Sequence, residues 1–335
     1  MKKIIVIGFG FMGYTHADRI SVSRKFQLCA IVDRDREIVQ KTLSANAGNL
    51  QLNKTASLNV SAIPVYTDLD ECLIKEKPDA AAICLPTQYH YSIAKKCLSA
   101  GLHVFMEKPM CLSADEGREL INLAATYKRV FMIAHCLRFS EEYLYLKKCI
   151  DENLYGKPEF ISFSRSSGAP SWGGWKNNEV RLNSGGALYD MNIHDIDFLN
   201  YLCGKPAHIK SVLIKGPVST ADYILSSWQY TGGLMAHIQG GFLFHSKMPF
   251  SCGYICRFSD ASLRYSSINK NVIEIASDGN LSQITLGDSD PYREEIDYFC
   301  DCVIHGRRPE RCLPEDSLEA VILCRETELT AEVSD

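Results

Sequence analysis

Residues 3–13, Lys3-Ile4-Ile5-Val6-Ile7-Gly8-Phe9-Gly10-Phe11-Met12-Gly13, decide the fold of this chain. The apolar run that opens the stretch is typical of a buried strand, and a helical period begins where the glycines end. Gly8 permits a tight turn, Gly10 lets the backbone approach a pyrophosphate, and Gly13 lets helix and strand pack closely. Free N–H groups and the dipole at a helix N-terminus favour anions. The stretch therefore predicts a strand–turn–helix unit that binds a dinucleotide.

An acidic residue supports this interpretation. A second apolar strand is predicted at Leu28–Val32, and Asp33 follows it, 20 residues after Gly13. An acid at this place accepts hydrogen bonds from the adenosine ribose hydroxyls and repels a 2′-phosphate. Arg34 beside it is of the type that holds the 2′-phosphate of NADP. We therefore expect NAD as the cofactor, with NADP as the alternative.

The rest of the first 135 residues alternates apolar β-type runs with helical patterns. The runs lie at Ala80–Leu85, His103–Met106 and Val130–Ala134. Apolar strands that alternate with helices are typical of a parallel sheet covered on both faces. The sequence therefore predicts a doubly wound α/β domain.

The second half has a different pattern, in which strands follow one another without helices between them. Such strands form an antiparallel sheet. The predicted elements are helices at Ser140–Asn153 and Gly186–Leu202, a strand at Glu159–Arg165, strands from His208 to about Leu286, and closing helices at Tyr292–His305 and Pro314–Val333.

Composition narrows the class of protein. The chain has 335 residues, 46% of them hydrophobic, and a formal net charge of −4 without runs of like charge, which argues against a dedicated nucleic-acid binder. The apolar stretch Ile4–Ile7 is too short for a secretory signal or a membrane span. The 14 cysteines are scattered and lack zinc-ligand spacing, so we expect free thiols, a reducing cytoplasmic compartment and no metal.

Glu107-Lys108-Pro109 follows the predicted strand at His103–Met106 directly. Lys108 is therefore expected at the carboxyl end of a parallel strand, where ligands of open α/β sheets bind. A lysine there can hydrogen-bond a substrate hydroxyl or stabilise developing negative charge. A surface lysine before a loop is the alternative.

Asp190 and His194 stand four residues apart in a predicted helix and so share one face of it. A carboxylate beside an imidazole orients the ring and raises its basicity, which suits a general base that removes a hydroxyl proton. Ordinary surface polarity is the alternative for this pair taken alone.

Taken together, the glycine motif, Glu107-Lys108-Pro109 and Asp190-x₃-His194 resemble the Gfo/Idh/MocA family, named for glucose–fructose oxidoreductase, inositol dehydrogenase and a rhizopine-catabolism protein. The likeness covers essentially the whole chain. It includes Pro86 with His90, residues 100–104 and Arg138-Phe139. The chain departs from the family pattern at Leu85-Pro86-Thr87, often Thr-Pro-Asn, and at Asn192, usually glycine.

The resemblance implies a Rossmann domain, residues 1–135, joined to an α/β domain, residues 136–335, with a large, mostly antiparallel open sheet that forms homodimers or homotetramers. The last helices are candidates for packing back on the first domain. The implied activity is hydride transfer between a nicotinamide and a sugar, cyclitol or related polyol. Lys108 would position the substrate hydroxyl, His194 would be the acid/base, and Asp190 its partner. The expected cofactor-binding residues are Gly8, Phe9, Gly10, Phe11, Met12, Gly13, Asp33, Arg34, Leu85, Pro86, His90, Glu107 and Lys108.

Ser166–Ser184 has no period and is expected to be a long loop next to the Asp190 helix. Its aromatic and hydrogen-bonding side chains suit a polyol, so it is a candidate pocket wall, with a surface loop or dimer contact as the alternative. The candidate substrate-binding residues are Arg165, Trp172, Trp175, Asn183 and Tyr189.

Two other functions compete with a dehydrogenase that acts on a small molecule, without nucleic acid or membrane. One is a glycoside hydrolase that retains NAD for a transient oxidation. The other is a non-catalytic regulator that binds the nucleotide, which would need only the glycine motif and not Lys108, Asp190 and His194 as well.

Overall fold

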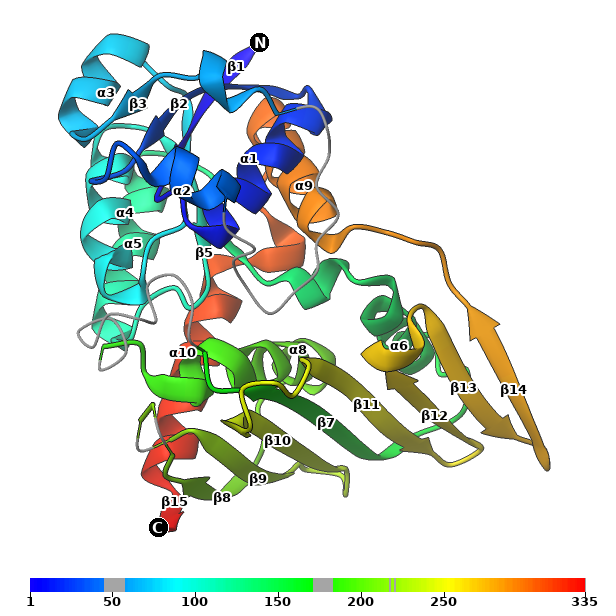
Figure 1. Cartoon of the computed structure of the whole chain (residues 1–335). Coiled ribbons are helices and arrows are strands. Elements are labelled where there is room, and N and C mark those ends of the chain that lie inside the picture. The colour runs from blue at the N-terminus through cyan, green and yellow to red at the C-terminus, as the bar shows by residue number, and fades with distance from the viewer. Residues whose placement is uncertain (45–57, 171–182, 217, 220, 335) are drawn as a thin grey trace. The chain divides into compact units, whose positions relative to one another are not determined.

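The structure is a computed structural model that describes residues 1–44, 58–170, 183–216, 218–219 and 221–334. These residues form two compact units (Figure 1). The first comprises the described parts of Met1–His135 together with Tyr292–Leu318. The second comprises the described parts of Cys136–Ser171, Arg181–Pro291 and Glu319–Asp335.

The first unit contains a parallel sheet of six strands in the order β3-β2-β1-β4-β5-β6. This is the strand order of a doubly wound dinucleotide-binding sheet, and it reverses between β1 and β4. Its strands are β1 (Lys2–Ile7), β2 (Phe26–Val32), β3 (Val65–Tyr66), β4 (Ala80–Ile83), β5 (His103–Glu107) and β6 (Phe131–Ala134).

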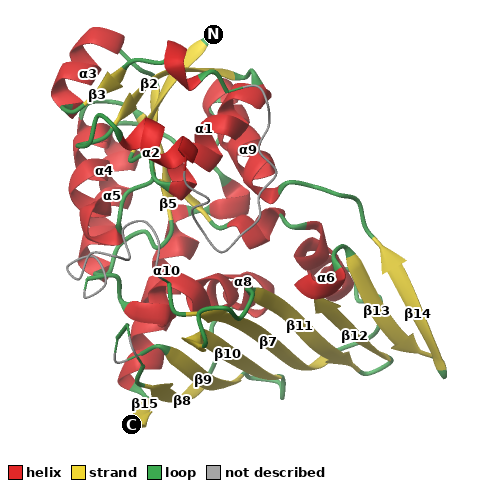
Figure 2. Ribbon diagram, in the orientation of Figure 1, coloured by secondary structure: helices red, strands yellow, loops and turns green. Residues whose placement is uncertain are grey.

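Helices cover both faces of this sheet, as Figure 2 shows. They are α1 (Phe11–Ser23), α2 (Ile38–Ser44), α3 (Leu69–Glu76), α4 (His90–Ser99), α5 (Ala114–Thr126) and α9 (Pro291–His305). On one face, Phe299 of α9 contacts Phe26 and Phe105, and His16 of α1 meets Phe105 edge-on at 4.9 Å between ring centroids. β4 is buried along its whole length, as expected for a central parallel strand.

The second unit contains a sheet of nine strands in the order β14-β13-β12-β11-β7-β10-β9-β8-β15. Apart from the pairs β7–β10 and β8–β15, neighbouring strands are antiparallel. The strands are β7 (Pro158–Gly168), β8 (His208–Ile214), β9 (Tyr223–Gln229), β10 (Met235–Phe244), β11 (Ser251–Phe258), β12 (Ala261–Ser266), β13 (Val272–Ser277), β14 (Asn280–Thr285) and β15 (Ala331–Ser334).

Helices α6 (Glu141–Asp151) and α8 (Ile193–Cys203) pack on one face of this sheet. Tyr143 of α6 and Phe198 of α8 both contact Phe163 of β7. Side chains alternate along β7, so Ile161, Phe163 and Arg165 are buried beneath the helices. The predicted fold class, a doubly wound parallel sheet and a mostly antiparallel open sheet, is confirmed.

Two details of the sequence prediction are wrong. The helix predicted to run from Pro314 to Val333 ends at Leu329 (α10, Pro314–Leu329), and residues 331–334 pair with β8 as β15. The loop predicted from Ser166 begins later, because β7 continues to Gly168 beside β10 and β11. No helix of the described residues is long and apolar enough to cross a membrane.

Candidate functional site

The glycine motif forms the turn between β1 and α1, as predicted. Gly8 has φ +86°, and a Cβ there would lie 2.7 Å from the carbonyl oxygen of Cys84, which follows β4. A Cβ on Gly13 would lie 1.9 Å from the carbonyl oxygen of Gly8. Only glycine therefore fits these two positions without moving the backbone. A Cβ on Gly10 would meet no atom within 4 Å, so the space beside it is open.

Asp33 lies at the carboxyl end of β2 and is bonded to this turn. Its Oδ2 accepts a hydrogen bond from the Phe9 N–H at 2.8 Å, and its Oδ1 accepts one from the Asp35 N–H at 3.0 Å. The Phe9 side chain is buried, so its part in this site is played by its backbone, and Arg34 is exposed.

The surroundings of this turn fit a dinucleotide. The first turn of α1, which contains Phe11 and Met12, holds no acidic residue, and the space beside Gly10 admits a phosphate. The half-buried Asp33 carboxylate stands where ribose hydroxyls would donate to it.

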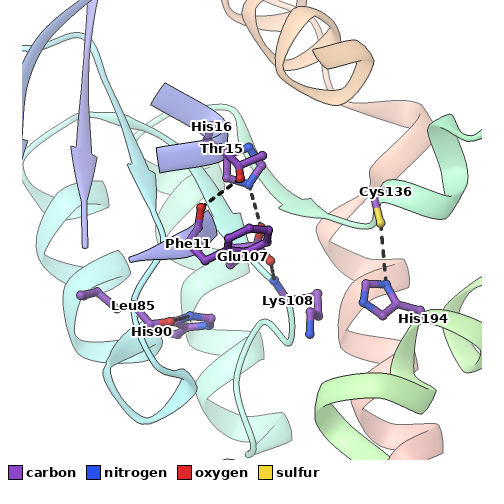
Figure 3. A network of polar contacts seen from close by, with 9 residues as sticks. All are labelled: Phe11, Thr15, His16, Leu85, His90, Glu107, Lys108, Cys136 and His194. Carbon is purple, nitrogen blue, oxygen red and sulfur yellow. Dashed lines mark hydrogen bonds and ion pairs between the residues drawn. The ribbon is translucent and has the colours of Figure 1, made fainter. Parts of the chain in front are cut away.

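Glu107 ends β5 and is buried beneath α1. Its Oε1 lies 2.7 Å from Nε2 of His16, and its Oε2 accepts the Lys108 N–H at 3.2 Å (Figure 3). Burial alone would raise the pKa of Glu107. The hydrogen bond from His16 and the positive charges of His16, Lys108 and His90 outweigh burial and lower that pKa. Glu107 is thus a buried carboxylate that fixes the backbone of Lys108 and is not exposed to solvent.

Lys108 is half-buried and directly follows the carboxyl end of β5, where the sequence predicted it. Leu85 and Pro86 follow β4 at the same edge of the sheet and are also partly exposed. His90, expected among the cofactor-binding residues, is fully buried, and both its nitrogens face backbone carbonyls. Its side chain can therefore influence a cofactor only through that backbone.

Asp190 and His194 lie in the second unit, around the start of α8. The predicted helix contains one π-helical segment, Leu188–Asn192, followed by α8. Such segments often occur at functional sites. Both side chains are half-buried, and Nδ1 of His194 lies 4.0 Å from Sγ of Cys136 (Figure 3). The sequence reasoning missed Cys136, because nothing local links it to a histidine 58 residues later.

Two buried carboxylates of α8, Asp195 and Asp197, lie just after His194, and each is paired with an arginine. Arg138 binds Asp197 through Nε and Nη2 at 2.9 and 2.8 Å. Arg165 binds Asp195 through Nε and Nη2 at 3.1 and 2.9 Å. Arg165, which was expected to bind substrate, is buried in this pair, and it lies on the inward face of β7.

The remaining substrate candidates differ in placement. Tyr189 is buried and Asn183 is exposed. Trp172 and Trp175 lie outside the described residues. The candidate catalytic residues divide between the units, with Lys108 in the first and Asp190 and His194 in the second.

Comparison with protein families gives two matches that follow each other along the chain. Residues 2–135 match the model described as "Oxidoreductase family, NAD-binding Rossmann fold". Residues 143–257 match the model of the GFO/IDH/MocA C-terminal domain.

Several curated relatives are named as dehydrogenases of sugars or cyclitols. The chain is 28% identical over 214 residues to D-glucoside 3-dehydrogenase of Escherichia coli, which covers 63% of this chain and 56% of that protein. It is 27% identical over 201 residues to inositol 2-dehydrogenase of Rhizobium meliloti, covering 60% and 54%. The matched segment thus spans little more than half the length of these relatives.

Solved structures share the fold over almost the whole chain. A UDP-N-acetylglucosamine 3-dehydrogenase from Acidithiobacillus ferrooxidans superposes with a TM-score of 0.79 at 20% identity, covering 99% of this chain and 98% of that one. A levoglucosan dehydrogenase in complex with NADH and levoglucosan gives a TM-score of 0.82 at 16% identity, covering 98% and 96%.

Proposed function

Since this chain belongs to the Gfo/Idh/MocA family of NAD-binding oxidoreductases, we propose that it transfers a hydride between a nicotinamide cofactor and a hydroxyl-bearing carbon of a sugar, cyclitol or related polyol. The observation that carries the proposal is the carboxyl edge of the parallel sheet. There the strands β1, β2 and β5 are followed directly by Gly8, Asp33 and Lys108, which are suited to phosphate, ribose and substrate hydroxyl.

The cofactor supplies the atom that accepts or donates the hydride. In the proposed complex, the backbone beside Gly10 and the N-terminus of α1 hold the pyrophosphate, and Asp33 accepts from the ribose hydroxyls. The negative charge of Asp33 favours NAD over NADP. Arg34, which is exposed next to it, is the residue that would bind a 2′-phosphate.

The residues assigned to chemistry are Lys108, Asp190 and His194. Hydride leaves a carbon most readily when the proton of its hydroxyl is removed, so a base must stand at that oxygen. We assign this role to His194, with Asp190 orienting the ring and contacting substrate. Lys108 donates a hydrogen bond to the same hydroxyl and stabilises the negative charge that develops on its oxygen. Among the remaining substrate candidates, Tyr189 and Asn183 stay part of the proposal.

The test is nicotinamide absorbance with purified protein and a panel of cyclitols, aldoses, uronates and amino sugars, each with NAD and with NADP. We expect one class of polyol to reduce NAD. No net change in absorbance, together with a nucleotide that copurifies and persists through dialysis, would favour the NAD-retaining hydrolase. Silence with freely exchanging NADH would favour the regulator.

Two glycine variants show whether the turn holds the cofactor. Gly10→Ala adds a methyl group to open space, so the free protein should keep its melting temperature while NADH binding weakens by about tenfold or more. Gly13→Ala places a Cβ against the Gly8 carbonyl and should lower the melting temperature as well. Equal NADH affinity in wild type and Gly10→Ala would place the cofactor elsewhere.

We also propose that the nine-stranded sheet joins copies of the chain as a homodimer or homotetramer. Phe160 and Met235 are paired in register on β7 and β10, and Ile255 lies on β11; all three are exposed. Apolar side chains gathered on one sheet face mark interaction surfaces. Sedimentation should show an oligomer that Phe160→Asp with Met235→Asp converts to a monomer. A monomeric wild type would contradict this.

We also propose a cytoplasmic location, and the state of the cysteine thiols supports it. None of the fourteen cysteines, all of which lie within the described residues, forms a disulfide, and most are buried. Unpaired thiols persist in reducing compartments. Thiol titration of protein unfolded directly from a cell extract should find every cysteine reduced, and disulfides there would contradict it.

A further inference from the structure

His90 connects two backbone segments that leave the sheet at the cofactor edge. It begins α4 and is fully buried. Its Nδ1 lies 2.7 Å from the carbonyl oxygen of Pro109, and its Nε2 lies 2.8 Å from that of Leu85 (Figure 3). Leu85 follows β4 and Pro109 follows β5, so one imidazole bridges the ends of two neighbouring strands.

Both contacts are hydrogen bonds. If the ring were turned over, carbon atoms would lie at these distances from the two oxygens, closer than the roughly 3.3–3.6 Å of a C–H···O contact. A carbonyl oxygen only accepts, so each nitrogen must donate, and a neutral imidazole carries one N–H. The complete bridge is therefore made by the imidazolium form of His90.

Burial has the largest effect on His90 and lowers its pKa below the ordinary histidine value. The two carbonyl acceptors and Glu107, whose carboxylate is held by His16, oppose burial and raise that pKa, and the Lys108 charge lowers it further. Protonation of His90 thus completes the bridge, and its loss leaves one of the two bonds.

The backbone of Lys108 is fixed from both sides. Its own N–H donates to Glu107, whose other oxygen is bound to His16 of α1. The carbonyl of the next residue, Pro109, accepts from His90 of α4. These contacts leave the Lys108 side chain attached to a short segment with little freedom to shift.

We propose that His90 is a positioning residue: by binding the carbonyls of Leu85 and Pro109 it holds the segment that carries Lys108 at the cofactor edge of the sheet. It touches neither cofactor nor substrate and acts through the backbone. The consequence for turnover rests on the proposed function, whereas the tether itself does not.

Hydrogen exchange of the full-length protein tests the tether without any substrate. His90→Phe keeps the ring shape and removes both donors, and His90→Gln keeps one donor group. We expect His90→Phe to speed exchange in peptides covering 84–89 and 107–112 by about tenfold, with His90→Gln between it and wild type.

The matched control is His103→Phe, which removes a partly buried imidazole and its hydrogen bond from the Val130 N–H at the opposite end of β5. It should lower the melting temperature but leave exchange at 107–112 unchanged. If His90→Phe lowers the melting temperature as the control does and also leaves 84–89 and 107–112 unchanged, His90 only fills space and the proposal is overturned.

Kinetics with the polyol found in the absorbance panel test the consequence. His90→Phe should lower kcat by about tenfold or more and leave the NADH dissociation constant within about threefold. In a Lys108→Met background it should lower kcat no further, because residues that act through one another are not additive. Additive losses would overturn the positioning role. If wild type oxidises no polyol, the proposed function fails, and the exchange result still decides whether the tether exists.

Discussion

The segment that carries Lys108 and the helix that carries His194 are both fixed by buried polar side chains, but of different chemistry. In the first unit, imidazoles hold the segment: His16 binds Glu107, and His90 binds backbone carbonyls. In the second unit, guanidinium groups hold the helix: Arg138 binds Asp197, and Arg165 binds Asp195.

This difference in chemistry determines which of the two segments is held by groups whose charge changes with pH. An imidazole changes charge near neutral pH, whereas a guanidinium stays charged at every accessible pH. The guanidinium groups that hold the His194 helix therefore keep their charge, whereas burial raises the pKa of the Asp195 carboxylate. Loss of either partner of a buried pair carries a large penalty. In the frame of the Lys108 segment, His90 makes both of its hydrogen bonds only when it is protonated, and burial lowers its pKa.

The largest expected effect is on stability in the second unit. Arg138→Met removes the guanidinium that pairs with the buried Asp197 carboxylate, so the free energy of unfolding should fall by about 3–5 kcal/mol. Urea denaturation measures this. Lys75→Met, which breaks the exposed pair Lys75–Glu71, is the control and should cost about 0.5 kcal/mol or less.

The double variant Arg138→Met, Asp197→Leu sharpens the result, because it removes both buried charges together. It should recover most of the lost stability. A single Arg138→Met that costs no more than the Lys75 control would show that the pair does not hold α8.

The next effect concerns catalysis. His194→Ala should lower kcat for polyol oxidation by about 100-fold or more and remove the limb of the pH profile on which activity falls as histidine is protonated. The melting temperature should change little, since the flanking arginine pairs remain. An unchanged profile in the variant would assign the base to another residue.

The two units also differ in how much of their structure could be predicted from the sequence. Apart from the two-residue strand β3, the first sheet and the place of Lys108 were predictable because each signal is local: glycines between a strand and a helix, and apolar runs of strand length. β15 was not predictable, because residues 331–334 continue a helical pattern and become a strand only by pairing with β8, more than a hundred residues earlier.

The same reason separates the site residues. The bond between His16 and Glu107 joins positions 91 residues apart, and no local pattern encodes it. Arg165 was within reach of sequence reasoning, because it continues the inward face set by Ile161 and Phe163 and so needs a buried partner. That partner, Asp195, could be found only from the packing of α8 on β7.

A smaller effect is expected on the preference for NADH over NADPH. Its size shows whether Asp33 disfavours NADPH by its negative charge or, like Asp197, mainly accepts hydrogen bonds that hold the structure. Asp33→Asn keeps an oxygen for the Phe9 N–H and removes the charge. NADPH affinity relative to NADH should rise by about tenfold, roughly 1.4 kcal/mol. Fluorescence titration measures both constants. A constant ratio with a lower melting temperature would make Asp33 structural.

The smallest effect is the response of the first unit to acid, at the amino end of β5. Nδ1 of His103 accepts the Val130 N–H at 2.9 Å, and burial with the charges of Arg129 and Lys2 lowers the pKa of His103 to about 4. The unfolded chain binds this proton near pH 6.5. The stabilisation from His103 should therefore be complete above pH 6.5 and disappear as pH falls towards 4.

Urea denaturation of wild type and His103→Gln between pH 7 and 4 measures this response. The wild-type stability should fall more steeply than that of the variant, by a fraction of one proton, because glutamine does not titrate. Hydrogen exchange, corrected for pH, should rise in β5 before it rises in α8, whose arginine partners keep their charge. Equal slopes in the two proteins, or earlier opening of α8, would show that imidazoles do not set the acid response of the first unit.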